Sequence, residues 1–102
     1  MERRLAAILI ADIAGYSKLM GKDEASTLTL VKTLWNDHFE PKVVEHHGRI
    51  VKLMGDGVLA EFPSVIEAVQ SAIAIQRNAG KRNAELAVDD RIEMRIGINL
   101  GD

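Results

Sequence analysis

The sequence predicts an α+β domain in which helices cover one face of an antiparallel sheet. Three observations support this fold class. An apolar run comes first, two strand-like runs flank a Gly-Asp-Gly turn in the middle, and a segment of alternating hydrophobicity comes last. Segments with apolar residues at helical spacing lie between them. The resulting order, βαββαβ, is that of the ferredoxin-like fold.

The first predicted strand is the apolar run of residues 5–12, which begins at Leu5 and ends at Asp12. Because both of its faces are apolar, we expect a central strand that is buried on both sides. Gly15 interrupts the run. Residues 16–20 then have the pattern of a short helical turn, which we expect Gly21 to end.

Asp23 is the predicted N-cap of the next helix. Its expected core face has spacings of three and four residues. That face comprises Leu28, Val31, Leu34 or Trp35, His38 and Phe39. Pro41 predicts a kink or a new first turn, because proline lacks the N–H group that a helix interior needs. After residues 42–47, Gly48 is the predicted C′ residue.

Residues 48–54 and 58–62 predict two strands of a hairpin around the turn 55–57, which Pro63 ends. Ser64 and Glu67 have the spacing of a capping box at the start of another helix. The expected core face of this helix comprises Val65, Ala68, Val69, Ala72, Ile73 and Gln76. We expect the polar residues 78–90 to fray the helix into a loop. Residues 92–98 alternate between apolar and other residues and predict the last strand.

Composition limits the possible functions. A chain of 102 residues, 47% of them hydrophobic, suits one small domain with a real core. The net charge of −2 argues against nucleic-acid binding through a basic surface. The chain has no cysteine, which excludes disulfides and thiolate metal sites within it, and its apolar runs are too short to span a bilayer. We therefore expect a cytoplasmic protein, or a cytoplasmic part of a larger one.

Two aspartates are the strongest candidates for chemistry. Asp12 ends the first strand, and Asp56 lies in the hairpin turn. If these strands are neighbours, both carboxylates lie at one edge of the sheet. Mg²⁺ and Mn²⁺ prefer such oxygen ligands and often bridge to substrate phosphates. The alternative is that Asp56-Gly57 is an ordinary hairpin turn.

The turn after Asp12 and a lysine in the hairpin are further candidates. A glycine-containing turn that enters a helix exposes backbone N–H groups, which suits phosphate, although a simple strand-to-helix turn has the same pattern. Lys52 could donate to the edge of a nucleotide base, or its stem could cover apolar surface. We expect His38 to pack in the core. Adjacent His46 and His47 cannot face one site from a regular helix, which argues against zinc.

Three segments together resemble the class III adenylate/guanylate cyclase catalytic domain in its bacterial branch. They are residues 4–17 (RLAAILIADIAGYS), 48–57 (GRIVKLMGDG) and 95–102 (RIGINLGD), in family-like order and spacing. The resemblance extends over essentially the whole chain. It implies that residues 1–102 form a single partial catalytic domain without its C-terminal part. A second purine-reading residue and an Asn-x-x-x-Arg motif lie further on in the family, so we expect little or no turnover by this chain alone.

The resemblance also implies roles for individual residues. Asp12 and Asp56 would bind two Mg²⁺ or Mn²⁺ ions, with a contact from the carbonyl of Ile13. The triphosphate would lie against the backbone of Ala14, Gly15, Tyr16 and Ser17. Lys52 would read the purine and favour ATP, since lysine can donate to N1 of adenine. The reaction would be attack of the ribose 3′-hydroxyl on the α-phosphate, which yields cyclic AMP and pyrophosphate.

The resemblance further implies a homodimer with active sites at the interface. One protomer would supply the metal-binding aspartates and its partner the purine-reading lysine. Two alternatives stay open at this point. The first is a non-catalytic dimerisation or nucleotide-sensing module. The second is another ferredoxin-like binding domain such as an RNA binder, which the acidic balance and the lack of an aromatic stacking platform disfavour.

Overall fold

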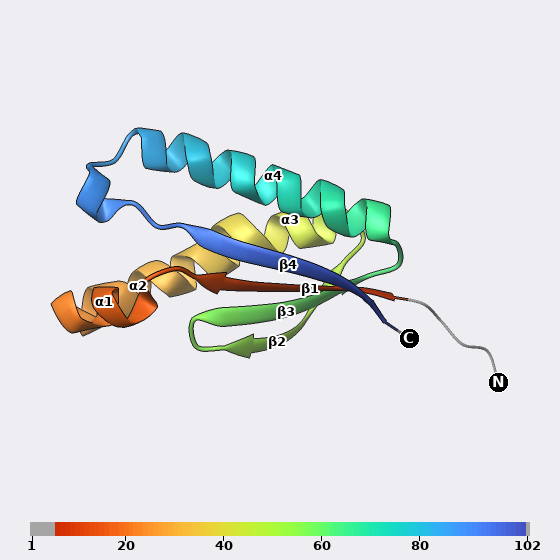
Figure 1. The fold of residues 1–102 in the computed structure, drawn as a ribbon, viewed down its shortest axis with the longest axis horizontal. Coiled ribbons are helices and arrows are strands. Elements are labelled where there is room, and N and C mark those ends of the chain that lie inside the picture. Colours follow the sequence, from red (N-terminus) through yellow and green to blue (C-terminus); the bar gives the residue numbers. More distant parts are fainter. Residues whose placement is uncertain (1–5, 102) are drawn as a thin grey trace.

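A computed structural model describes residues 6–101 and contains one four-stranded antiparallel sheet, in the order β2-β3-β1-β4 (Figure 1). The strands are β1 (Ala6–Ile13), β2 (Arg49–Met54), β3 (Gly57–Phe62) and β4 (Met94–Gly101). The helices are α1 (Tyr16–Lys22), α2 (Glu24–Thr33), α3 (Glu40–Glu45) and α4 (Val65–Ala84), with a π-helical segment η1 (Leu34–Phe39) and a 3₁₀ turn η2 (Val88–Asp90). The predicted βαββαβ order and ferredoxin-like fold are confirmed. Arg4, Leu5 and Asp102, which belong to the predicted first strand and motifs, lie outside the described residues.

The helices cover a single face of the sheet, and the core lies beneath them (Figure 1). On β1 the residues directed to this face are fully buried: Ala7, Leu9, Ala11 and Ile13. Ile10, on the opposite face, is 42% exposed. The prediction that the first strand is buried on both faces is therefore wrong. The strand is central, but successive side chains point to opposite faces and only one face carries helices.

The segment from α2 to α3 is a continuous run of helical backbone with the wider π-helical segment η1 in its middle. Asp23 caps α2 as predicted, because its carboxylate accepts a hydrogen bond from the backbone N–H of Ser26 at 3.1 Å. The side chains of Val31, Leu34, Trp35 and Phe39 are buried, whereas Leu28 and His38 are exposed, contrary to prediction. The π-helical segment brings both Leu34 and Trp35 into the core, which the spacing left as alternatives. Pro41 lies in the first turn of α3, where the missing N–H does no harm.

The C-terminus of α3 differs from prediction. His47, rather than Gly48, has the left-handed backbone with φ 66°, and the N–H of Gly48 donates to the carbonyl of Val43 at 2.8 Å. Gly48 has another reason to be glycine, since a Cβ there would lie 2.4 Å from Cε2 of Phe62. Gly21 also fails to end a helix, because α1 continues to Lys22.

Helix α4 begins where predicted but extends further. The hydroxyl of Ser64 accepts a hydrogen bond from the backbone N–H of Glu67 at 3.2 Å, which confirms the predicted cap. The helix continues to Ala84, so the expectation of a loop from residue 78 is wrong for 78–84. The side chain of Asn83 explains the polar end of the helix. It pairs with both the N–H and the C=O of Ile92, at 3.1 and 2.7 Å, and so secures the approach to β4.

The buried face of α4 is rotated relative to the predicted one. The buried residues are Ala68, Ser71 and Ile75, whereas Val65, Val69, Ile73 and Gln76 are exposed. The hydroxyl of Ser71 donates to the carbonyl of Lys42 at 3.3 Å, so this buried polar group joins α4 to α3. Within residues 6–101, no helix has the length and apolar character needed to cross a membrane.

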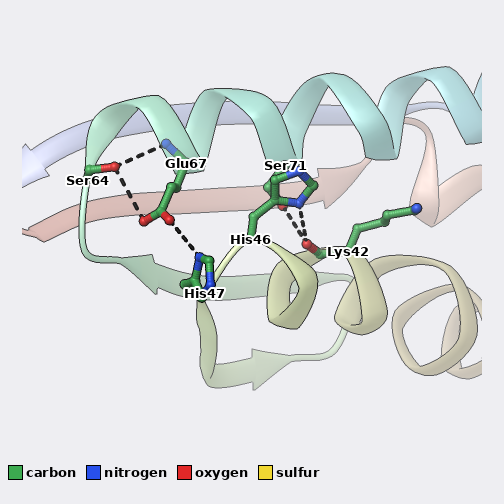
Figure 2. Close-up of polar contacts among 6 residues, drawn as sticks. All are labelled: Lys42, His46, His47, Ser64, Glu67 and Ser71. Carbon is green, nitrogen blue, oxygen red and sulfur yellow. Dashed lines mark hydrogen bonds and ion pairs between the residues drawn. The ribbon is translucent and has the colours of Figure 1, made fainter.

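Two histidines at the end of α3, just before β2, make polar contacts, and one of these contacts reaches α4 (Figure 2). Nδ1 of His46 lies 2.8 Å from the carbonyl of Lys42, and Nδ1 of His47 lies 2.7 Å from Oε1 of Glu67. The two adjacent histidines thus have different partners, one on α3 and one on α4. The contact of His47 joins the end of α3 to α4, whereas that of His46 stays within the α3 segment.

Candidate functional site

The first strand and the hairpin tip meet at one end of the sheet. β1 pairs antiparallel with β3, and this register places Asp12 directly opposite Gly57, the residue after Asp56. The N–H of Ile13 donates to the carbonyl of Asp56 at 3.2 Å. The structure therefore brings Asp12, Ile13 and Asp56 together, as the strand order led us to expect.

The hairpin tip is also tied to the helical layer. The indole N–H of Trp35 donates to the carbonyl of Gly55 at 3.4 Å, and Gly55 has a left-handed backbone with φ 60°. Trp35 is only 4% exposed and packs edge-on against Phe39, with ring centroids 5.2 Å apart. The tip that carries Asp56 is thus held by β1 on one side and by η1 on another. Helical spacing offered Trp35 as an alternative to Leu34 on the core face, but it did not predict this contact.

An ion pair links Asp12 to the other neighbouring strand. In the β1–β4 register Asp12 lies opposite Arg95. Nε of Arg95 lies 2.7 Å from Oδ1 of Asp12, and Nη2 lies 3.1 Å from Oδ2. The hydrogen bond and the charge of Asp12 raise the pKa of Arg95 above its ordinary value, and the charge of Asp56 adds to the effect. Arg95 was not predicted as a site residue, although the alternation of residues 92–98 puts it on the face opposite the apolar side chains.

The loop after β1 makes a backbone hydrogen bond to the residue that precedes β4. The N–H of Ala14 donates to the carbonyl of Glu93 at 2.9 Å, so this amide already has a partner. Gly15 adopts φ 70° at the N-cap of α1, without a side-chain cap. Tyr16 packs against the core and Ser17 is exposed. The amides of the first helical turn point away from the helix and lack intrahelical acceptors, which is the geometry that favours an anion.

Lys52 lies apart from the aspartates. It is exposed on β2, opposite Leu59 of β3, and a β-bulge separates it from Ile50. The registers place Lys52 and Asp12 on the same face of the sheet, the one without helices, but β3 lies between their strands. Within one chain the structure therefore groups Asp12, Asp56 and Arg95, while Lys52 faces outward elsewhere on the same surface.

The oxygen donors at the strand end fit a hard divalent cation. Among residues 6–101, no cluster of three or more His, Asp or Glu side chains could hold a metal by itself. Asp12 and Asp56 supply two carboxylates, and Ile13 adds a nearby carbonyl. Mg²⁺ is commonly bound by one or two carboxylates, with substrate phosphates and water as further ligands. Two carboxylates and one carbonyl are therefore enough protein ligands for such an ion.

Comparisons with known proteins find relatives among the nucleotidyl cyclases. No protein-family model matches the chain. The whole chain is 50% identical to a segment that makes up 17% of a Rhizobium meliloti (strain 1021) protein named "Putative adenylate cyclase 3". It also matches the crystal structure of an adenylate/guanylate cyclase/hydrolase from Silicibacter pomeroyi, with a TM-score of 0.88 and 42% identity over 98% of this chain and 58% of that chain. Over its whole length the chain is thus similar to class III nucleotidyl cyclase catalytic domains.

More distant cyclase structures share the fold. The guanylyl cyclase Cya2 matches with a TM-score of 0.80 and 25% identity, over 98% of this chain and 55% of that one. A bacterial light-regulated adenylyl cyclase has a TM-score of 0.86 at 19% identity, which shows the fold alone. Our chain thus spans little more than half of these solved cyclase chains and about a sixth of the Rhizobium protein.

Proposed function

We propose that residues 1–102 form part of an adenylate cyclase catalytic domain that converts ATP to cyclic AMP and pyrophosphate. The observation that carries the proposal is the convergence of Asp12 and Asp56 at one sheet end, in a chain similar to nucleotidyl cyclase catalytic domains. Paired carboxylates next to a glycine-containing turn suit a metal–triphosphate substrate. We place the protein in the cytoplasm, where ATP is available.

The chain's own residues have distinct roles in this proposal. Asp12, Asp56 and the carbonyl of Ile13 hold two Mg²⁺ or Mn²⁺ ions, and the amides after Gly15 bind the triphosphate. When bound, such cations favour ionisation of an attacking hydroxyl and stabilise charge on a leaving pyrophosphate. The amide of Ala14 already bonds Glu93. We therefore assign phosphate binding to Gly15, Tyr16 and Ser17, with Ala14 in a supporting role.

Lys52 supplies base recognition from a second protomer. Its ammonium group can donate to N1 of adenine, whereas N1 of guanine carries a hydrogen and calls for an acceptor. Lys52 lies on the helix-free sheet face but two strands from β1, so its position supports a homodimer in which each chain serves both sites. Exposed apolar side chains on that face, Ile10 and Met54, support burial against a second copy.

The test is nucleotide turnover by the natural protein that contains these residues, with Mn²⁺-ATP and Mn²⁺-GTP as substrates. We expect cyclic AMP as the main product. Removing a metal ligand forfeits several kcal/mol of transition-state stabilisation, so Asp56→Asn should reduce turnover by about 100-fold or more. Asp37→Asn, which makes the same change at an exposed position of η1, is the matched control.

Two results would contradict the proposal: absence of cyclic nucleotide from the unmodified protein, or equal activity of the Asp56→Asn and Asp37→Asn variants. A second candidate, a non-catalytic dimerisation or nucleotide-sensing module, is favoured by the exposed Ile10 and Met54. It predicts a stable dimer by sedimentation and no product with any divalent metal.

A further inference from the structure

We propose that Arg95 competes with divalent cations for the carboxylate of Asp12 and thereby sets the cation affinity of this site. The inference rests on the proposed function, because it assumes that Asp12 is a metal ligand. It adds a residue on β4 that tunes the site from a neighbouring strand. The cation in question is a small divalent ion such as Mn²⁺ or Mg²⁺.

The ion pair between Arg95 and Asp12 occupies the carboxylate that a cation would bind. Nε and Nη2 of Arg95 bond different oxygens of Asp12, at 2.7 and 3.1 Å, so both oxygens of the carboxylate are engaged. Bidentate arginine–carboxylate pairs are the best-oriented of charged hydrogen bonds. A cation that binds Asp12 needs at least one of the same oxygens. The guanidinium and the cation therefore use the same two oxygens, and their positive charges repel each other there.

The position of Arg95 is a property of the sheet. β1 and β4 pair from Ala6 opposite Gly101 to Ile13 opposite Met94, and this ladder places Arg95 directly across from Asp12. Directly opposed residues on one face have Cβ atoms about 5 Å apart. The guanidinium is thus presented to Asp12 by two strands rather than by a mobile loop.

Charge makes the competition permanent across ordinary pH. An arginine side chain does not lose its proton in proteins. Deprotonation therefore cannot release Asp12, and only another cation can displace Arg95.

Exposure makes displacement possible. The side chain of Arg95 is 70% exposed and that of Asp12 is 41% exposed. When the guanidinium leaves Asp12, water solvates it, so it does not become a buried unpaired charge. We therefore expect Arg95 to reduce cation affinity without abolishing it.

The same sheet face contains a matched ion pair. Nε of Arg49 on β2 lies 2.6 Å from Oε1 of Glu61 on β3, and the two side chains are 68% and 34% exposed. This pair resembles Arg95–Asp12 in chemistry and exposure. One strand, β3, lies between β2 and β1, so β2 is about 10 Å from β1, and solvent ions screen most of the charge of Arg49 at that range. Arg49→Gln therefore makes the same change of charge without the direct competition.

The experiment is a titration of the purified 102-residue chain with Mn²⁺ and no nucleotide, in which electron paramagnetic resonance measures free Mn²⁺. We expect Arg95→Gln to bind Mn²⁺ about fivefold more tightly than the unmodified chain, because a unit positive charge leaves the immediate surroundings of the carboxylate. Arg49→Gln should match the unmodified chain, and Asp12→Asn should lose the site. Arg95→Lys, which keeps the charge but not the bidentate contact, should lie between the unmodified chain and Arg95→Gln.

The outcomes separate this inference from the proposed function. If Arg95→Gln binds Mn²⁺ no more tightly than Arg49→Gln while binding still depends on Asp12, the inference about Arg95 is wrong but the proposed function stands. Mn²⁺ binding that persists in Asp12→Asn, or no binding by any variant, would overturn both. If circular dichroism shows that Arg95→Gln is unfolded, Arg95→Lys decides the question, and an affinity equal to that of the unmodified chain would overturn the inference.

Discussion

The indole N–H of Trp35 donates a hydrogen bond to the carbonyl of Gly55, 3.4 Å away, across 20 residues of sequence. This contact connects the π-helical segment η1 to the hairpin tip immediately before Asp56. The backbone of Asp56 is in turn bonded to the N–H of Ile13. A buried tryptophan in the helical layer thus helps to fix the end of the sheet where the candidate ligands meet.

Replacement of Trp35 by phenylalanine should loosen the hairpin tip. The change keeps an aromatic ring near Phe39 but removes the N–H donor and leaves the Gly55 carbonyl without this partner. We expect the free energy of unfolding to fall by about 1 kcal/mol because the hydrogen bond is lost, and to fall further because the smaller ring fills less of the core. Urea unfolding measures the stability, and hydrogen exchange at residues 55–57 measures the local effect. Exchange rates there that match the unmodified chain would contradict this role.

A methyl group at position 48 should destabilise the fold. An added Cβ at Gly48 would lie 2.4, 2.6 and 2.8 Å from three atoms of the Phe62 ring, which is 1% exposed and cannot move aside without repacking. We expect Gly48→Ala to reduce the free energy of unfolding by about 1–3 kcal/mol, as overpacking does elsewhere.

Gly80→Ala is the control for that variant. Gly80 lies within α4, and a Cβ there would meet no atom within 4 Å. Alanine favours helix over glycine, so this change should stabilise the chain by up to about 1 kcal/mol. Thermal or urea unfolding compares the two variants. Equal changes in the free energy of unfolding, with the same sign, would show that the contact with Phe62 does not exclude a side chain at position 48.

The cap of α2 should contribute a stability term that depends on pH. Hydrogen bonds from the backbone N–H and then the hydroxyl of Ser26 lower the pKa of Asp23. Because the folded state favours the ionised carboxylate, this contribution is fully present above the unfolded pKa, which is about 4, and is lost as the pH falls through the lower folded pKa.

Comparison with Asp23→Asn isolates that contribution, since asparagine also caps helices but does not titrate. The difference in free energy of unfolding between the unmodified chain and Asp23→Asn should be constant from pH 5 to 7. Below about pH 4 it should shift in favour of the variant. Urea unfolding at each pH measures both proteins. A difference that does not change with pH would rule out the proposed linkage.

Local sequence patterns determined the order of the elements and several of their ends. The N-caps at Asp23 and Ser64 and the hairpin turn at Asp56 were predictable because each depends on residues within a few positions. The meeting of Asp12 with the hairpin tip was also predictable. It follows from the strand order alone, since the first strand of this topology pairs with the second strand of the hairpin.

Tertiary structure decided the features that depend on contacts between distant segments. The buried face of α4 passes through Ser71 rather than Ile73, because packing against α3 and the sheet selects the rotation of a helix whose apolar residues extend around more than one side. The phenylalanine ring that excludes a side chain at Gly48 comes from β3. The pairing of Arg95 with Asp12 requires the register of two strands 83 residues apart. Sequence supplied each of these side chains, but only the folded chain determined which of them touch.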